Sequence, residues 1–302
     1  MTRDEFEIEV DKRVADALGQ WELPSVVYHY TSDAGFRGIV AERKLWATHR
    51  NFLNDHGEQD YAFDLLKEVA ATHPCGSART AAADMAKQDV LTRFGAFVAC
   101  FSKHPDSLSQ WRAYAQDGRG FSVGIDPRNV PKAEDLGIKA ALSLGPYLCP
   151  VVYHKDRQVE ALRKLLDLAT LSWPSPAGAE SADKQRRYLF DKCNTLMTLL
   201  AMSFKHDAFL EEGETRLVWI GPSPADVEAT SMSSGLPLAF RMTLHGFAPY
   251  LTWPLAPEGS KAIHDVVTGP KHGQASADWC GAFLKWHGHK DSPLRRSSAT
   301  YR

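Results

Sequence analysis

The sequence predicts an α+β fold in which two strand-rich regions share one β-sheet and a helical insertion separates them. Short runs of β-branched and aromatic residues, bounded by turn residues, are typical of strands. Such runs fall at 26–30, 44–49, 94–102, 120–126 and 147–153, and again at 215–221, 236–244, 249–255 and 262–270. Residues 155–210 instead show helical spacing on both sides of a loop, "WPSPAGAESAD", at 173–183.

Neither strand region is followed by an obvious linker, and each region alone contains few strands. We therefore expect a single domain over residues 26–302 with a helical insertion at about 155–210. An N-terminal helix and linker at 1–25 should precede it. The helix is expected over 3–18, where apolar residues recur at helical spacing.

The stretch "VVYHYTSDAGFRGIV" (26–40) predicts a strand followed at once by a helix. Ser32 or Asp33 is a suitable N-cap for that helix, whose apolar face carries Phe36, Ile39 and Val40. If the strand is regular, Tyr28 and Tyr30 point to the face opposite His29. Thr31 then lies on the side of His29.

The nearly continuous apolar run "FGAFVACFS" (94–102) indicates a central strand. Helices are expected at 58–73, 79–92 and 275–287, and a helical turn at 106–115. The alternating segment 120–126 should form a strand that pairs with 94–102. Pro150 marks a bulge or a sheet edge.

Composition excludes several protein classes. The 302 residues carry a net charge of −2, so no global basic field indicates nucleic-acid binding. The five cysteines are scattered and odd in number, which favours reduced thiols in the cytoplasm. A charged N-terminus without an apolar segment predicts no signal peptide, and no run is long enough to cross a membrane.

Standard catalytic motifs are absent: the chain has no Walker A loop, no GxGxxG after a strand and no GxSxG elbow. "DHGE" (55–58) with His49 lacks the ligand spacing of a metal site, so we expect no metal.

Three polar clusters remain: "YHYTS" (28–32), "SLSQWRAY" (107–114) and "FLEEGETRLVW" (209–219). Each has an ordinary structural explanation when taken alone: a core histidine, a packed aromatic pair and a solvated acidic turn.

Taken together and in order, these blocks resemble a known family. The pattern "YHYTS…KLW…FLND", "ACFS…SLSQWRAYAQDGRGFSVGID", "EGETRLV" and "TGP" runs from about residue 26 to the end of the chain. It is similar to the bacterial family called domain of unknown function number 2971. The opening block also resembles the first motif of ADP-ribosyltransferases, especially those that modify DNA bases.

The second resemblance implies a split antiparallel or mixed β-sheet with flanking helices and NAD bound in its cleft. It implies a triad of His29, Tyr114 and Glu214, with Ser102 or Ser109 as alternatives to Tyr114. NAD would be a substrate, contacted by the residues His29, Tyr30, Thr31, Ser109, Trp111 and Arg112. Trp111, or Tyr114 of the triad, would stack on nicotinamide, and Arg112 would bind the pyrophosphate.

The implied activity is NAD-dependent ADP-ribosyl transfer by a bacterial toxin or defence effector. The acceptor, nucleic acid or protein, stays open, and an antitoxin or regulatory protein would be a partner; no membrane association is expected. Three alternatives remain: an NAD glycohydrolase, a non-catalytic nucleotide- or partner-binding module, and a serine hydrolase that uses His29 with Ser102 or Ser109.

Overall fold

A computed structural model describes residues 3–19, 24–53, 57–87, 94–138, 145–171, 179–222, 236–243 and 246–301. Its α-helices are α1 (Arg3–Leu18), α2 (Asp33–Glu42), α3 (Gly57–Thr72), α4 (Gly76–Lys87), α6 (Leu108–Tyr114), α7 (Lys155–Ala169), α8 (Ala179–Ala201) and α10 (Gln274–Trp286). Short 3-10 helices are η1 (Arg50–Phe52), η2 (Pro127–Asn129), η3 (Glu134–Leu136) and η4 (Asp207–Glu212).

The strands are β1 (Val27–Thr31), β2 (Lys44–His49), β3 (Phe94–Ser102), β4 (Phe121–Ile125), β5 (Tyr147–Pro150), β6 (Glu214–Pro222), β7 (Leu238–Thr243), β8 (Gly246–Pro254), β9 (Asp265–Thr268) and β10 (Leu294–Arg296). Within the described chain they form one mixed sheet in the order β10-β9-β4-β1-β3-β2-β8-β7, with β6 paired to β3 and β5 to β6. The two strand-rich regions therefore share a sheet, as the sequence predicts.

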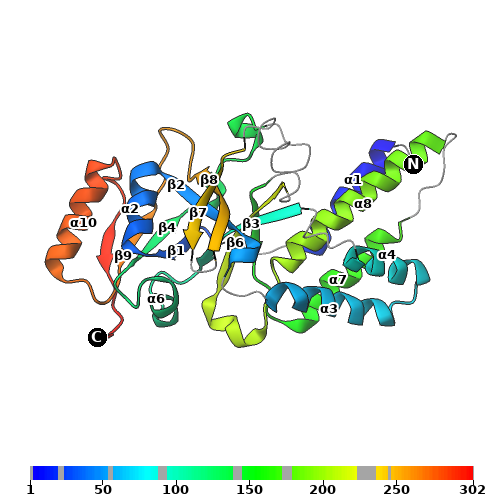
Figure 1. Ribbon diagram of the computed structural model, residues 1–302, viewed down its shortest axis with the longest axis horizontal. Coiled ribbons are helices and arrows are strands. Elements are labelled where there is room, and N and C mark those ends of the chain that lie inside the picture. Colours follow the sequence, from blue (N-terminus) through cyan, green and yellow to red (C-terminus); the bar gives the residue numbers. More distant parts are fainter. Residues whose placement is uncertain are drawn as a thin grey trace.

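The sheet divides along one edge of β3. The other edge pairs with β6 over the full length of both strands. On the dividing edge, β2 occupies one end through Thr48 and Val98, and β1 meets the other end at Tyr28 and Ser102. One edge of β3 therefore carries two strand groups. The group β1-β4-β9-β10 joins one end of this edge, and the group β2-β8-β7 joins the other (Figure 1).

The expected pairing of 120–126 with 94–102 is wrong. β4 pairs with β1 and β9, because β1 takes the position beside β3. Periodicity identified both strands but carries no information on which strand lies between them.

Strand alternation explains why the run 94–102 is apolar throughout. Val98 pairs with Val218, and both are buried under helices α1, α3, α4, α7 and α8. Phe97 pairs with Trp219, and both belong to the core on the opposite face, which includes side chains from α2 and α10. The strand is therefore buried on both faces.

Helix α1 packs against α7 and α8, so the N-terminal helix joins the helical insertion at one end of the molecule, with α10 at the other (Figure 1). Its bounds match the sequence prediction. Ser32 caps α2 by accepting a hydrogen bond from Gly35 N at 3.2 Å, also as predicted.

Several other element boundaries differ from the prediction. The helix expected at 79–92 begins earlier, at Gly76, and the strands expected at 147–153 and 262–270 are shorter, Tyr147–Pro150 and Asp265–Thr268. Helix α8 begins at Ala179, so its first turn lies in the segment expected to be a loop, 173–183, and residues 173–178 of that segment lie outside the described chain. The three-residue strand β10 has no counterpart in the prediction.

Candidate functional site

A small cavity of about 130 Å³ opens where β1 separates from β3. The strands contribute His29, Cys100, Ser102, Glu214 and Arg216, and the segments around them contribute Gln110 and Tyr114 from α6, Glu212 from η4, and Lys205. The cavity is lined by all three members of the triad that the resemblance implies, although they are far apart in the sequence: His29, Tyr114 and Glu214.

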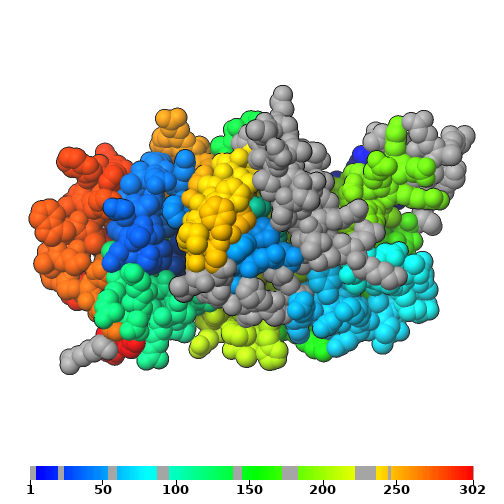
Figure 2. Space-filling view, in the orientation of Figure 1, coloured from blue at the N-terminus to red at the C-terminus, as the bar shows by residue number. Residues whose placement is uncertain are grey.

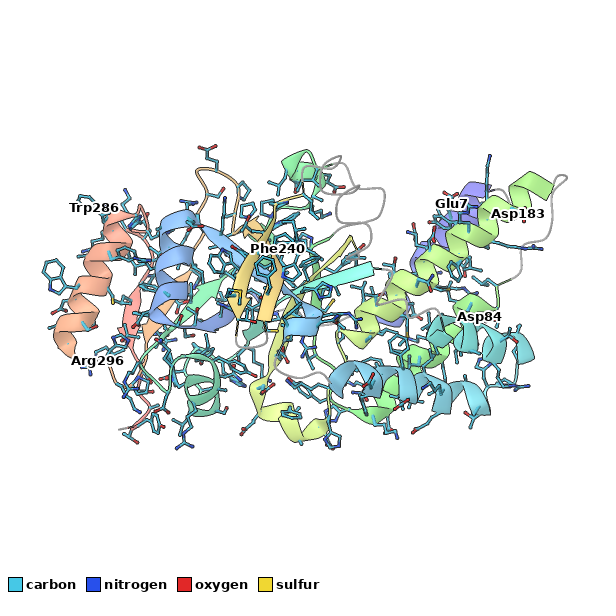
Figure 3. All side chains as sticks on the ribbon, in the orientation of Figure 1. Glu7, Asp84, Asp183, Phe240, Trp286 and Arg296 are labelled. Atoms are coloured by element: carbon cyan, nitrogen blue, oxygen red, sulfur yellow. The ribbon has the colours of Figure 1, made fainter. Side chains whose placement is uncertain are left out.

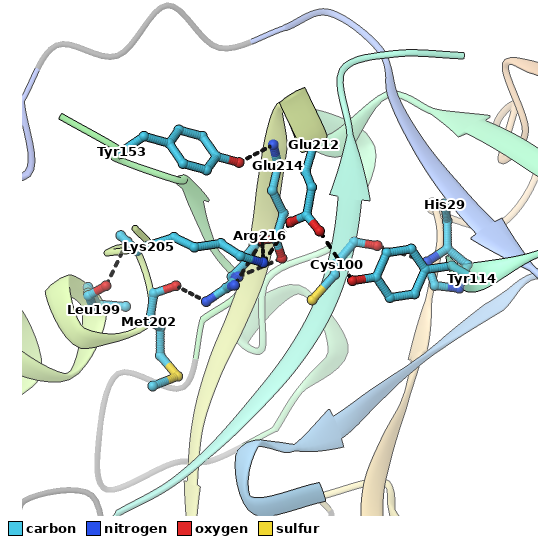
Figure 4. A network of polar contacts seen from close by, with 11 residues as sticks. His29, Cys100, Tyr114, Tyr153, Leu199, Met202, Lys205, Glu212, Glu214 and Arg216 are labelled. Atoms are coloured by element: carbon cyan, nitrogen blue, oxygen red, sulfur yellow. Dashed lines mark hydrogen bonds and ion pairs between the residues drawn. The ribbon is translucent and has the colours of Figure 1, made fainter. Parts of the chain in front are cut away.

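A cluster of four charged side chains closes one wall (Figure 4). Arg216 forks onto Glu214, with Nε 2.7 Å from Oε1 and Nη2 2.9 Å from Oε2. Lys205 Nζ bridges the two carboxylates, at 2.6 Å from Glu212 and 3.2 Å from Glu214. We call these four residues the ion cluster.

Glu214 is the more enclosed of the two carboxylates. Its side chain is 9% exposed and that of Glu212 is 15% exposed. Burial alone would raise the pKa of Glu214, but the charges of Arg216 and Lys205 and the thiol of Cys100 outweigh it and bring this pKa down to about 2. Glu214 therefore stays ionised and is held by two cations.

Gly213 allows the chain to turn between these two carboxylates. Its φ of 51° lies in the left-handed region, which favours glycine. A Cβ at this position would also lie 2.8 Å from carbons of the Lys103 side chain. The sequence Glu212-Gly213-Glu214 can thus direct both carboxylates to Lys205.

Tyr114 reaches into the cavity from the end of α6. Its hydroxyl lies 3.5 Å from Oε1 of Glu212, the long limit of a hydrogen bond, and its ring is 40% exposed. Burial of the hydroxyl and the charge of Glu212 raise its pKa, so Tyr114 keeps its proton. The aromatic ring and a protonated hydroxyl are both available at the mouth of the cavity.

His29 is fixed by the backbone of β3. Nδ1 lies 2.9 Å from the carbonyl oxygen of Cys100. Because a carbonyl can only accept, Nδ1 carries the proton and donates it. Burial, aided by the charge of Arg241, lowers the pKa of His29 although the bond to Cys100 opposes this. A neutral His29 therefore presents Nε2 as an acceptor.

Strand register separates His29 from Glu214. Tyr28 pairs with Ser102, and Ser102 pairs with Glu214, so these three residues share one face of the sheet. His29 follows Tyr28 and has the opposite parity. Both still line the cavity because it lies at the opening between β1 and β3; in the close-up the ring of Tyr114 lies between them (Figure 4).

Of the alternatives for the second triad position, Ser102 also lines the cavity, but its hydroxyl is engaged. It donates to the carbonyl of Glu212 at 2.6 Å and accepts from His104 N at 3.1 Å. Ser109 is paired with Ser107 at 3.1 Å. Tyr114 is thus the candidate with a hydroxyl directed into the cavity.

Other residues that the resemblance placed around NAD are used in packing. Tyr30 lines the cavity, yet its hydroxyl accepts from Ser107 N and donates to the carbonyl of His104, both at 2.8 Å. Trp111 is fully buried against Tyr30, with ring centroids 4.8 Å apart, so it offers no face for stacking on a ligand. Thr31 is buried and absent from the cavity lining.

Arg112 does not point to the cavity. Its guanidinium lies over the ring of Tyr301, 4.8 Å from the centroid, on the outer side of α6. The expected pyrophosphate role of Arg112 is therefore not supported by its position. Arg112 is only two residues from Tyr114 in sequence. Residues two apart in a helix do not face the same way, so the two side chains lie on different sides of α6.

Asp106 anchors the helix that carries Tyr114. It accepts hydrogen bonds from Trp111 Nε1 at 2.7 Å and from the backbone N of Ser298 at 2.7 Å, and it also contacts the hydroxyl of Ser297 at 2.5 Å. The segment 297–301 is thereby held against α6.

Sequence reasoning missed Glu212, Lys205 and Arg216 as members of the site. Glu212 and Arg216 stand two residues either side of Glu214, and a strand's period of two places Arg216 on the same face as Glu214. This signal was available. Nothing in the local sequence of Lys205 indicates that it is buried.

A wider cleft of about 900 Å³ lies between the end of α1, the start of α7 and β5. Lys164, one of the basic side chains lining it, is engaged by Asp16 and Glu160, each at 3.3 Å. Among the described residues, no group of three or more His, Cys, Asp or Glu side chains could hold a metal ion. His49 is buried, and residues 55 and 56 of the "DHGE" stretch lie outside the described chain.

No helix in the described part of the chain is long and apolar enough to cross a membrane. A family model described as a protein of unknown function (DUF2971) matches residues 110–217. The matched segment contains Tyr114 and all four residues of the ion cluster, and it excludes His29. No curated protein and no solved structure gives a match.

Proposed function

We propose that this chain is an NAD-consuming enzyme that transfers ADP-ribose. One observation carries the proposal: a neutral histidine, a protonated tyrosine and a pair of carboxylates line one cavity at the division of the sheet. These residue types come from β1, α6, η4 and β6, four separate elements. Such convergence of titratable groups with shifted pKa values in a cavity is typical of a functional site.

The reaction breaks the bond between nicotinamide N1 and ribose C1′. The bonding electron pair leaves with nicotinamide, which departs as a neutral molecule, and C1′ develops oxocarbenium character. A carboxylate beside the ribose stabilises this positive charge. A nucleophilic oxygen or nitrogen of the acceptor then bonds to C1′ and loses its proton.

The residues of the cavity suit these tasks. Glu212 has one cation partner and faces Tyr114, so its charge is the more available of the two carboxylates to a ribose. Glu214 keeps Arg216 and Lys205 in place. The ring of Tyr114 offers a stacking surface for nicotinamide, and His29 Nε2 can accept a hydrogen bond from a ribose hydroxyl or an amide.

The test is release of nicotinamide from NAD by the purified full chain. Replacing Glu212 by glutamine removes the charge and keeps the shape, so the rate should fall about 10²- to 10³-fold. The melting temperature should fall less than in a Glu214 variant, because Lys205 keeps Glu214 as a partner. Glu214→Gln should reduce both the rate and the melting temperature, because it leaves buried cations unpaired.

Glu211 supplies a matched control, since it is an exposed glutamate next to Glu212. Glu211→Gln should retain the wild-type rate. The proposal fails if the wild-type chain neither binds NAD nor releases nicotinamide when supplied with protein and nucleic-acid acceptors. Equal rates for wild type, Glu212→Gln and Glu214→Gln would also overturn it.

A further inference from the structure

Arg241 on β7 packs against a pair of adjoining aromatic rings on the side of the sheet that carries the ion cluster. Its guanidinium carbon is 5.3 Å from the ring centroid of Trp46 and 5.4 Å from that of Tyr250. The two rings are themselves 4.8 Å apart. Nη2 of Arg241 donates to the hydroxyl of Thr48 at 2.7 Å. Three contacts therefore fix the orientation of one guanidinium.

This guanidinium has unused donors. Among the described residues, Arg241 makes no ion pair, and its buried Nε has no hydrogen-bond partner. Burial lowers its pKa, yet an arginine remains charged. Arg241 is half-buried, and a partly buried charge without a carboxylate carries a desolvation cost unless something else compensates it. Two ring faces compensate only in part.

Register places Arg241 on the same face as the cavity. Arg241 pairs with Ala248, and Tyr250, two residues further along β8, pairs with Thr48. Thr48 in turn pairs with Val98, which is two residues from Cys100 in the cavity wall. Thr48 on β2 is therefore one strand across and two residues along from Cys100 on β3. This corresponds to a distance of about 8 Å between their Cα atoms.

The side chains of Trp46 and Arg241 are both partly exposed to solvent. Trp46 is 41% exposed. The hairpin of β7 and β8 lies at the surface near the middle of the molecule, and the views show its side that carries Phe240 (Figures 2 and 3). Phe240, labelled on this hairpin, points to the opposite face from Arg241, because the two are adjacent in a strand. A ligand can therefore approach Trp46 and Arg241 from solvent.

We infer that Arg241, held by Trp46, Tyr250 and Thr48, binds the phosphate groups of a nucleoside diphosphate moiety whose remaining part extends toward the cavity. This rests on the proposed function, in which NAD is the substrate, and names the residue that holds its phosphates. Guanidinium groups bind phosphate oxygens with paired, charge-assisted hydrogen bonds. The exposed ring of Trp46 provides a stacking face for the base.

The experiment measures binding of ADP to the full chain by calorimetry. ADP carries the phosphates and base but no nicotinamide, so its binding does not depend on catalysis. Arg241→Gln should raise the Kd for ADP by about 10- to 100-fold, the range for losing a hydrogen bond to a charged group. Arg241→Lys should recover part of the loss.

Arg37 on α2 is the control, because it is exposed and lies on an element of the opposite core. Arg37→Gln should leave the Kd unchanged. Arg112→Gln tests the competing assignment. If Arg112→Gln weakens ADP binding and Arg241→Gln does not, the inference is wrong. It is equally wrong if wild-type protein does not bind ADP at millimolar concentration.

These outcomes separate the inference from the proposed function. Arg241-dependent binding of ADP without any nicotinamide release would keep the phosphate site and refute the enzyme. Nicotinamide release with the same KM for NAD in wild type and Arg241→Gln would keep the enzyme and refute the phosphate site. Trp46→Phe should remove the ADP-induced change in tryptophan fluorescence if the base lies on that ring.

Discussion

Two regions on one face of the sheet contain cationic side chains and differ in how these charges are compensated. In the ion cluster, Lys205 and Arg216 are saturated by Glu212 and Glu214 at distances of 2.6 to 3.2 Å. In the β7 region, Arg241 has aromatic rings and one hydroxyl as neighbours. The first region is complete without a ligand, whereas the second still has donors to offer.

The difference follows from desolvation. A buried ion pair loses about as much hydration energy as it gains from attraction, so its main effect is that each charge requires the other. Removing one partner is then costly. A cation that is compensated only by ring faces has weaker electrostatic partners than one in an ion pair. An anion that binds to it adds charge-assisted hydrogen bonds and so lowers its free energy.

The largest expected effect is on the ion cluster. Glu214→Ala should lower the free energy of unfolding by about 3–5 kcal/mol, because it leaves Arg216 and Lys205 buried without a full set of partners. Denaturation by urea measures it. A double variant, Glu214→Leu with Arg216→Met, should lose less than Glu214→Ala. If the double variant loses more, the cluster is stabilising in itself and the comparison needs revision.

Acid should weaken the same cluster. The pKa of Glu214 is about 2, below its ordinary value of 4.5, so its contribution is present above pH 4.5 and is lost as pH falls toward 2. The difference in unfolding free energy between wild type and Glu214→Gln should shrink by about 3 kcal/mol between pH 5 and pH 2. Glu211→Gln, at an exposed site, should show no such convergence. A constant difference across this range would contradict the assigned pKa.

Much of the fold could be predicted because the elements have strong local patterns. The run 94–102 is apolar on both faces, and Ser32 is an N-cap by residue type. The pairing partners could not be predicted in the same way. Nothing within 120–126 specifies that β1 separates β4 from β3, because that choice depends on non-local contacts.

The residues of the candidate site also differ in whether the sequence could indicate them. His29, Tyr114 and Glu214 came from resemblance in ordered blocks, and all three line the cavity. Arg112 was chosen for its closeness in sequence to Tyr114, whereas Arg241 has no motif around it. Its position depends on the register of β7, β8 and β2, three strands whose pairing the sequence does not specify.

Asp106 sharpens the comparison because neutral donors rather than cations satisfy its charge. Burial would raise its pKa, but hydrogen bonds from Ser297, Trp111 and Ser298 outweigh this and lower it. Asp106→Ala should cost about 2 kcal/mol in unfolding free energy, less than Glu214→Ala, since the donors it leaves are uncharged and partly exposed. Hydrogen exchange should also become faster in α6. Unchanged exchange there would mean that other contacts position Tyr114.

The smallest effect on stability is expected at Arg241. Arg241→Gln removes two cation–π contacts and a bond to Thr48, and it also removes an incompletely compensated charge, so unfolding free energy should change by about 1 kcal/mol or less. Ligand should reveal the difference instead. With ADP at 100 times its Kd, the wild-type chain should gain about 2.7 kcal/mol of stability, and the variant, binding more weakly, should gain much less. A thermal unfolding series with increasing ADP measures both quantities. A loss near that of Glu214→Ala without ligand would show that Arg241 is a structural charge like those of the ion cluster, and the contrast between the two regions would disappear.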